Sequence, residues 1–189
     1  MEDALWKLTG FLLAAILLFM VPTMAMLERQ DDVTLSLVQA EANRFADTAR
    51  DMGAITPRLY DRFTERLSAT GLLYDIRIRH QKRSWAPVYA TTTSGLAAAS
   101  GLAFSGEYDQ SRVTEGEQKI IGILYPATAA DMDDASRQYR MRAGDLLFVD
   151  VASRGETMAG ALRRMLLFRS IPGMGILARA GGMVRNEVD

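Results

Sequence analysis

The chain has 189 residues and a formal net charge of −1, with 49% hydrophobic and 24% charged residues. This composition is typical of a folded protein, and the balance of charge argues against a dedicated nucleic-acid-binding protein. The absence of cysteine excludes disulfides, thiolate zinc sites and cysteine nucleophiles. The single histidine, His80, excludes any site that needs two histidines from one chain. We therefore expect no cofactor and no nucleic-acid partner.

The first predicted element is an apolar N-terminal segment. Residues 11–21 carry no charge, and the wider stretch 5–27 contains Lys7 as its single charged residue. A helix of this length reaches about 34 Å, whereas the hydrocarbon core of a bilayer is about 30 Å thick. We therefore expect residues 1–27 to be a single-pass transmembrane anchor in the lipid bilayer of the cell membrane. Residues 28–189 would form an extracytoplasmic α+β domain.

Two alternatives to a permanent anchor remain open at this stage. Small residues at Thr23 and Ala25 fit the −3 and −1 positions of a signal-peptide cut after Ala25. The segment could also be a buried core helix, although one so uniformly apolar would need a large core around it. The lysines and arginines on its two sides nearly balance, so orientation is weakly specified. We expect the N-terminus on the cytoplasmic side, because the tail before the segment is short and the larger part of the chain is then the exported part.

The next predicted element is an amphipathic helix with apolar residues at helical spacing through 35–52, ended by Gly53 at the C′ position. No strong breaker separates it from the apolar segment, so we expect one helix to run through both. Pro22 would bend this helix rather than end it. A second helix begins with Pro57 at its first position and ends at Gly71.

The remaining chain predicts strands and short helices. Alternation over 74–80 indicates a half-buried strand, followed by a turn at 81–83 and a returning strand over 85–90. Residues 91–112 are rich in Ser, Thr, Gly and Ala and indicate a long surface loop. Thr114 and Glu117 match a capping box that opens a helix ending near Tyr125.

The last predicted elements are a hairpin over 140–151 with its turn at 142–145, a helix over 156–168, and a strand over 176–184. In that strand, Gly181 and Gly182 suggest a bulge or a crowded backbone. The predicted fold class is therefore α+β: a long N-terminal helix, first transmembrane and then soluble, packed on a small antiparallel sheet.

Candidate chemical sites are few. His80 lies on the apolar face of its strand, and a structural role is the simpler interpretation. Asp131, Asp133 and Asp134 could offer oxygens to Ca²⁺, but the glycine and distal glutamate of an EF-hand loop are missing, which favours a solvated acidic loop. The sequence shows no phosphate-binding glycine motif and no nucleophile with a base. We therefore expect no enzymatic activity.

Charge is unevenly distributed along the second half of the chain. Residues 106–135 have a net charge of −5, and residues 153–185 have +5 from six arginines and one glutamate. If these surfaces face away from each other, the basic surface of one subunit can meet the acidic surface of the next, which builds rings or filaments. If they face each other, they form internal pairs. Arg163, Arg164 and Arg169 are the candidates for contacts between subunits.

The order of elements resembles the TadE-like pseudopilins, and more closely the TadE-like proteins of Gram-positive bacteria and their conjugative elements. The resemblance covers most of the chain from about residue 35. Its motifs are ADTAR at 46–50, GAIT at 53–56, LY at 59–60, ATGLLYDI at 69–76, GD at 144–145 and GGMVRNE at 181–187.

This resemblance implies a pilin-like structural protein of a secretion, pilus or conjugation apparatus, whose N-terminal helix packs among the helices of its neighbours. The implied partners are other pilin-like subunits, including copies of this chain, a platform membrane protein and an assembly ATPase. Glu2 is the early acid that could set filament register. On the helix itself, Ala14, Leu18 and Pro22 are the candidate contact positions. The alternative function is a monomeric, signal-anchored binding module that uses the 91–112 loop.

Overall fold

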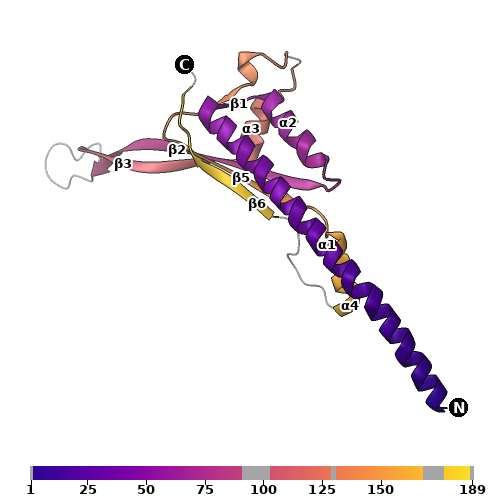
Figure 1. Ribbon diagram of the computed structural model, residues 1–189. Helices are drawn as coiled ribbons and strands as arrows, with labels where there is room; N and C mark the ends of the chain where they lie inside the picture. Colours follow the sequence, from indigo (N-terminus) through magenta and orange to yellow (C-terminus); the bar gives the residue numbers. More distant parts are fainter. Residues whose placement is uncertain (1, 91–102, 129–130, 168–176, 188–189) are drawn as a thin grey trace. The chain divides into compact units, whose positions relative to one another are not determined.

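The computed structural model describes residues 2–90, 103–128, 131–167 and 177–187. The protein is α+β, as expected, and Figure 1 shows its elements. In chain order they are α1 (Glu2–Met52), β1 (Ala54–Ile55), α2 (Pro57–Ser68), β2 (Tyr74–Ala90), β3 (Ala103–Glu115), α3 (Glu117–Leu124), the 3-10 helix η2 (Ala135–Arg137), β4 (Tyr139–Arg140), β5 (Leu146–Ser153), α4 (Met158–Leu167) and β6 (Leu177–Met183). β1 pairs antiparallel with β4, and the other strands form a sheet of order β3-β2-β5-β6.

Helix α1 is continuous from the apolar segment into the domain, which confirms that one helix runs through both. It continues through Pro22 and ends before Gly53, whose φ of +68° fits the predicted C′ position. A helix end leaves its last carbonyls without partners inside the helix. One of them is satisfied here, because the backbone N–H of Arg185 donates to the Arg50 carbonyl at 3.0 Å.

The chain divides into two compact units, and α1, α2, β2, β5 and β6 contribute to both. The first unit comprises residues 1–44, 62–76 and 150–180. Its buried residues come from the predicted helical faces and from β5 and β6: they are Val38, Ala42, Phe63, Leu67, Val151, Ala159 and Ala178. In this unit the Gln39 amide donates to the Arg179 carbonyl at 2.7 Å, which joins α1 to β6.

The second unit comprises residues 45–61, 77–149 and 181–189. Its largest fully buried apolar side chains include Phe45, Ile55, Ile78, Ile120, Leu124, Met141, Leu147 and Val149. Full burial of one such side chain stabilises a fold by about 1.5–3 kcal/mol. The predicted crowding at the two late glycines is confirmed, because a Cβ at Gly181 would lie 2.4 Å from the Leu147 carbonyl oxygen.

Two predictions about the region after residue 80 are wrong. Residues 81–83 form no turn, because β2 runs on to Ala90 and pairs antiparallel with β3 from His80↔Glu115 onward. Residues 103–112 belong to β3 rather than to a loop, and residues 91–102 of that predicted loop lie outside the described residues. A long ribbon of two strands therefore replaces the predicted short hairpin and loop.

Two further local predictions are corrected. The residue at the N-cap of α3 is Gly116, with no side-chain cap, and Thr114 lies in β3, so the capping box is not formed. The turn at 142–145 exists, since the N–H of Asp145 donates to the Arg142 carbonyl at 3.1 Å. It does not make a hairpin, because β4 before it pairs with β1 and β5 after it belongs to the other sheet.

Candidate functional site: an exposed apolar helix and its amphipathic neighbour

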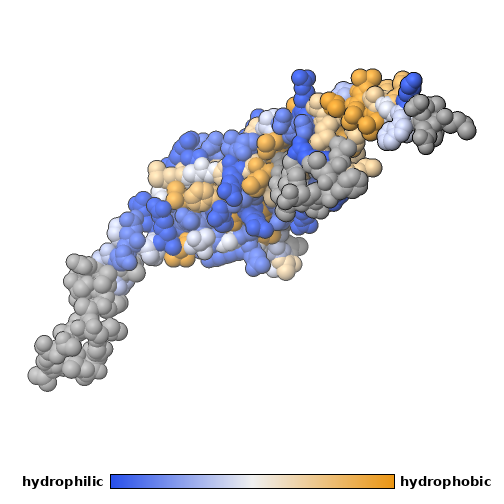
Figure 2. Space-filling model, turned by 90° about the horizontal axis from the view of Figure 1, so that it is seen from below, coloured by the Kyte–Doolittle hydropathy of each residue, from blue (hydrophilic) through white to orange (hydrophobic). Residues whose placement is uncertain are grey.

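Among the residues that the structure describes, one helix is long and apolar enough to cross a membrane, and it is α1. None of its most apolar 18-residue window is buried. Trp6, Phe11 and Leu18 keep 80%, 77% and 73% of their surface exposed. Figure 2 shows apolar side chains gathered over this part of the helix. Large exposed apolar surfaces of this kind are typical of segments that contact a membrane or another protein.

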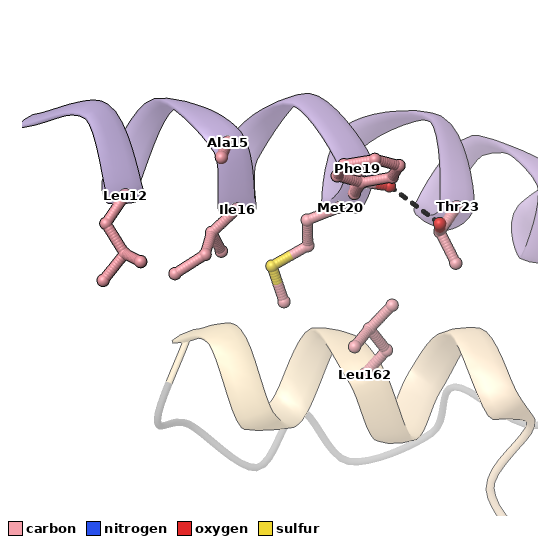
Figure 3. Close-up of a pocket in the computed structure, with 7 residues that line it drawn as sticks. All are labelled: Leu12, Ala15, Ile16, Phe19, Met20, Thr23 and Leu162. Carbon is pink, nitrogen blue, oxygen red and sulfur yellow. Dashed lines mark hydrogen bonds between the residues drawn. The ribbon is translucent and has the colours of Figure 1, made fainter.

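Helix α4 lies beside this apolar part of α1 and forms a groove with it (Figure 3). The groove has a volume of about 430 Å³. Its lining residues are Leu12, Ala15, Ile16, Phe19, Met20 and Thr23 of α1 and Leu162 of α4. The Thr23 hydroxyl donates to the Phe19 carbonyl at 2.7 Å, so the polar group at its edge is already hydrogen-bonded. The groove therefore suits an apolar occupant.

The predicted assembly residues fall on both helices. Arg163 of α4 pairs with Glu28 of α1, and Arg164 pairs with Glu156 at 3.0 Å. Ala14 and Leu18 are exposed on α1, with Pro22 one turn further along. Glu2 is the first residue of α1, and Arg169 lies outside the described residues. Their roles in assembly remain predictions.

The other arginines of 153–185 also have carboxylate partners within the chain. Arg154 pairs with Asp75 at 3.6 Å, Arg179 with Asp150 at 3.2 Å, and Arg185 with Asp51 at 2.9 Å. These partners, like those of Arg163 and Arg164, lie outside the acidic segment 106–135. The ion pairs are partly exposed, and such pairs contribute about 0–1 kcal/mol each.

A buried polar network occupies the second unit around His80. The ring of His80 is fully buried, with Nδ1 2.7 Å from the Tyr139 hydroxyl and Nε2 3.0 Å from Asp145 Oδ2. The Tyr139 hydroxyl donates to Glu115, and Lys82 and Lys119 also donate to that carboxylate. Asp145 accepts the backbone N–H groups of Arg83 at 3.0 Å and Arg142 at 3.1 Å. Both ring nitrogens of His80 thus have partners, which fits the structural role expected for it.

The network shifts the pKa values of its members. Burial lowers the pKa of His80, although the Asp145 carboxylate acts in the opposite direction. Burial alone would raise the pKa of Glu115, but hydrogen bonds from Lys119, Tyr139 and Lys82 lower it to about 2. Burial and the Glu115 carboxylate raise the pKa of the Tyr139 hydroxyl. At neutral pH Glu115 is therefore ionised and Tyr139 is neutral.

The predicted acidic loop is built from local contacts. Within the described ranges, no group of three or more His, Asp or Glu residues is arranged to hold a metal ion. Asp133 pairs with Arg58, and Asp134 caps η2 by accepting the backbone N–H of Ser136 at 2.9 Å. Asp131 is exposed. Asp133 and Asp134 thus have partners within the chain, and the solvated loop stays a prediction.

A polar pocket beside the His80 network was not found by sequence reasoning. It has a volume of about 500 Å³ and is lined by Lys82, Arg83, Arg140, Met141, Arg142, Asp145 and Glu187. Four of these side chains are cationic and two are anionic, so the pocket is basic. Its cations come from β2, β4 and the turn after β4, and no sequence motif joins them. Its chemistry suits an anionic group.

Comparisons with known proteins do not identify a family: no protein-family model, curated protein or solved structure matches the chain.

Proposed function

We propose that the protein is a membrane-anchored, pseudopilin-like structural subunit of a secretion, pilus or conjugation apparatus. The observation that carries this proposal is the continuity of α1 within one compact unit. Its N-terminal part exposes apolar side chains, and further along the same helix Val38 and Ala42 are fully buried in the domain. One helix thus serves as anchor and as part of the core of the first unit, which couples the position of that core to the position of the membrane segment.

A second observation supports packing against other subunits. Ala14, Leu18 and Pro22 follow one another at intervals of four residues, so they share one face of α1. This stripe does not line the groove with α4. A small residue such as Ala14 lets another helix approach closely in a membrane. We assign this face to neighbouring pilin-like subunits, including copies of this chain. The other proposed partners are a platform membrane protein and an assembly ATPase of the apparatus.

Crosslinking in native membranes tests this proposal. A photo-crosslinking amino acid placed at Ala14 or Leu18 should give covalent dimers and higher species. The same amino acid at Leu73, which is 77% exposed, directly precedes β2 and lies outside the apolar segment, is the matched control and should give fewer. Monomers alone from both helix positions would contradict the proposal.

A monomeric, anchored binding module is the second candidate function, and the basic pocket favours it. For this candidate we propose binding at Lys82, Arg83, Arg140 and Arg142, which line the pocket, instead of at the 91–112 loop. Guanidinium groups bind phosphate or carboxylate through paired hydrogen bonds. Calorimetric titration with inorganic phosphate should then show binding that Arg142→Gln weakens. This candidate fails if the unsubstituted protein binds neither phosphate nor a dicarboxylate.

A further inference from the structure

The starting observation is an apolar stripe on α4. Met158, Leu162 and Met165 follow the i, i+4, i+7 spacing and therefore share one side of the helix. Leu162 lines the groove with α1, but Met158 and Met165 remain 75% and 73% exposed. One side of α4 is therefore apolar both where it packs on α1 and where it is exposed.

The second observation is the level of α4 along α1. Leu162 shares the groove with Met20 and Thr23, which lie inside the apolar stretch 5–27. Its neighbour Arg163 pairs with Glu28, the first charged residue after that stretch. Helix α4 therefore lies along the apolar part of α1, and Arg163 reaches from it to the start of the charged part. Figure 1 shows α4 alongside that helix.

We propose that α4 is an interfacial helix that inserts Met158 and Met165 among the phospholipid acyl chains beside α1. This inference rests on the proposed anchoring of α1 in a bilayer. In this position Arg164, whose side chain is 53% exposed, lies at the level of the lipid phosphates. The apolar groove between Leu162 and α1 then holds part of an acyl chain.

Lipid fits this surface better than a second copy of the chain does. Leu162 of the stripe lines the groove with the exposed apolar part of α1, and the stripe is flanked by Arg164, whose exposed guanidinium group complements phosphate. Cationic residues beside exposed apolar ones are typical of helices that lie in a membrane interface. The stripe of Ala14 and Leu18, by contrast, has no flanking arginine within one helical turn and suits a neighbouring helix.

Depth measurements in a bilayer test the proposal. Because the chain has no cysteine, a single cysteine can carry an environment-sensitive fluorophore at Met165, Leu18 or Leu73. The full chain is reconstituted at low density in vesicles of phosphatidylcholine and phosphatidylglycerol with bromine on the upper acyl carbons. The label at Met165 should shift to shorter wavelength and be quenched by bromine, as at Leu18, whereas the label at Leu73 should keep a water-like spectrum.

The outcomes separate this inference from the proposed function. Quenching at Leu18 with a water-like spectrum at Met165 would overturn the interfacial role of α4 and leave the anchor in place. A water-like spectrum at both positions would overturn both proposals. Quenching at Met165 that is lost as the protein density rises would assign the stripe to a second copy, which also contradicts the lipid contact.

A variant without label provides an independent test. Met158→Glu with Met165→Glu adds two carboxylates to the stripe and should release α4 from the lipid. Amide exchange of residues 158–165 in nanodiscs should then become many times faster, with residues 11–21 unchanged. Met132→Glu, at a residue 45% exposed in the other unit, is the control and should leave α4 unchanged. Equal exchange in the variant and the unsubstituted protein would contradict the inference.

Discussion

Arg163 of α4 and Glu28 of α1 lie 135 residues apart in sequence and form an ion pair that joins the two helices. We predict that Arg163→Glu loosens α4 from α1, because it places two carboxylates together at this position. The double variant Arg163→Glu with Glu28→Arg reverses the ion pair and should restore most of the contact between the helices. We expect it to recover about 0.5–1 kcal/mol of interaction free energy. Spin labels on α1 and α4 measure the distance between the helices. The distance distribution should broaden in Arg163→Glu and narrow again in the double variant. No recovery in the double variant would show that the ion pair does not hold α4.

The His80 network gives a prediction about stability. His80→Ala removes one hydrogen-bond partner from Asp145 and one from Tyr139, and it removes a fully buried ring. We expect a loss of about 2–5 kcal/mol in the free energy of unfolding. Urea unfolding of the protein in detergent micelles measures it. Trp85→Ala, on the same strand but 60% exposed, is the control and should cost much less; equal losses would refute the structural role of His80.

The pH dependence of stability follows from the pKa shifts in this network. Glu115 has a folded pKa of about 2 against an ordinary value of 4.5, so the folded protein binds fewer protons and loses stability as pH falls through that range. The lowered pKa of His80 acts in the same direction below pH 6.5. The free energy of unfolding should therefore decrease on acidification, and Glu115 should account for about 2–3 kcal/mol of that decrease. The melting temperature should fall with it. Glu115→Gln should flatten the acid part of this curve and leave the part due to His80; an unchanged curve would count against the prediction.

Alanine substitutions at two glycines with positive φ distinguish the cost of backbone strain from the cost of a steric clash. Gly53 and Gly71 have φ of +68° and +76°, so alanine is strained at both. A Cβ at Gly53 would also lie 2.4 Å from the Asn186 carbonyl oxygen, whereas a Cβ at Gly71 meets nothing within 4 Å. We expect Gly71→Ala to cost about 1 kcal/mol and Gly53→Ala at least about 2 kcal/mol more. Thermal unfolding of the two variants tests this, and equal costs would contradict it.

The elements predicted correctly are those whose signal is local. The apolar spacing of residues 35–52, Pro57 at a helix start and Gly53 at a helix end each depend on neighbours within a few residues. The same holds for the burial of Ile78 and His80 on one face of β2. A period of two or 3.6 residues fixes such faces without knowledge of the rest of the chain.

The errors arose where partners are distant in sequence. Residues 81–83 are polar, which is typical of a turn, but here they belong to a strand that pairs with β3 at Lys82↔Val113 and Arg83↔Arg112. β4 pairs with β1, more than 80 residues earlier, so the local pattern around residue 140 could only suggest a hairpin. The basic pocket was missed for the same reason, because Lys82 and Arg142 meet only in the folded chain.

The central claim is that residues 5–27 remain part of the protein and hold it in a bilayer. Alkaline extraction of cell membranes, followed by intact mass measurement of the protein in both fractions, tests it most directly. We predict that the protein stays in the membrane pellet with its apolar N-terminal segment attached. Recovery in the soluble fraction of a protein that begins at Met26, as after a cut behind Ala25, would contradict the claim, as would a soluble protein that retains the whole segment.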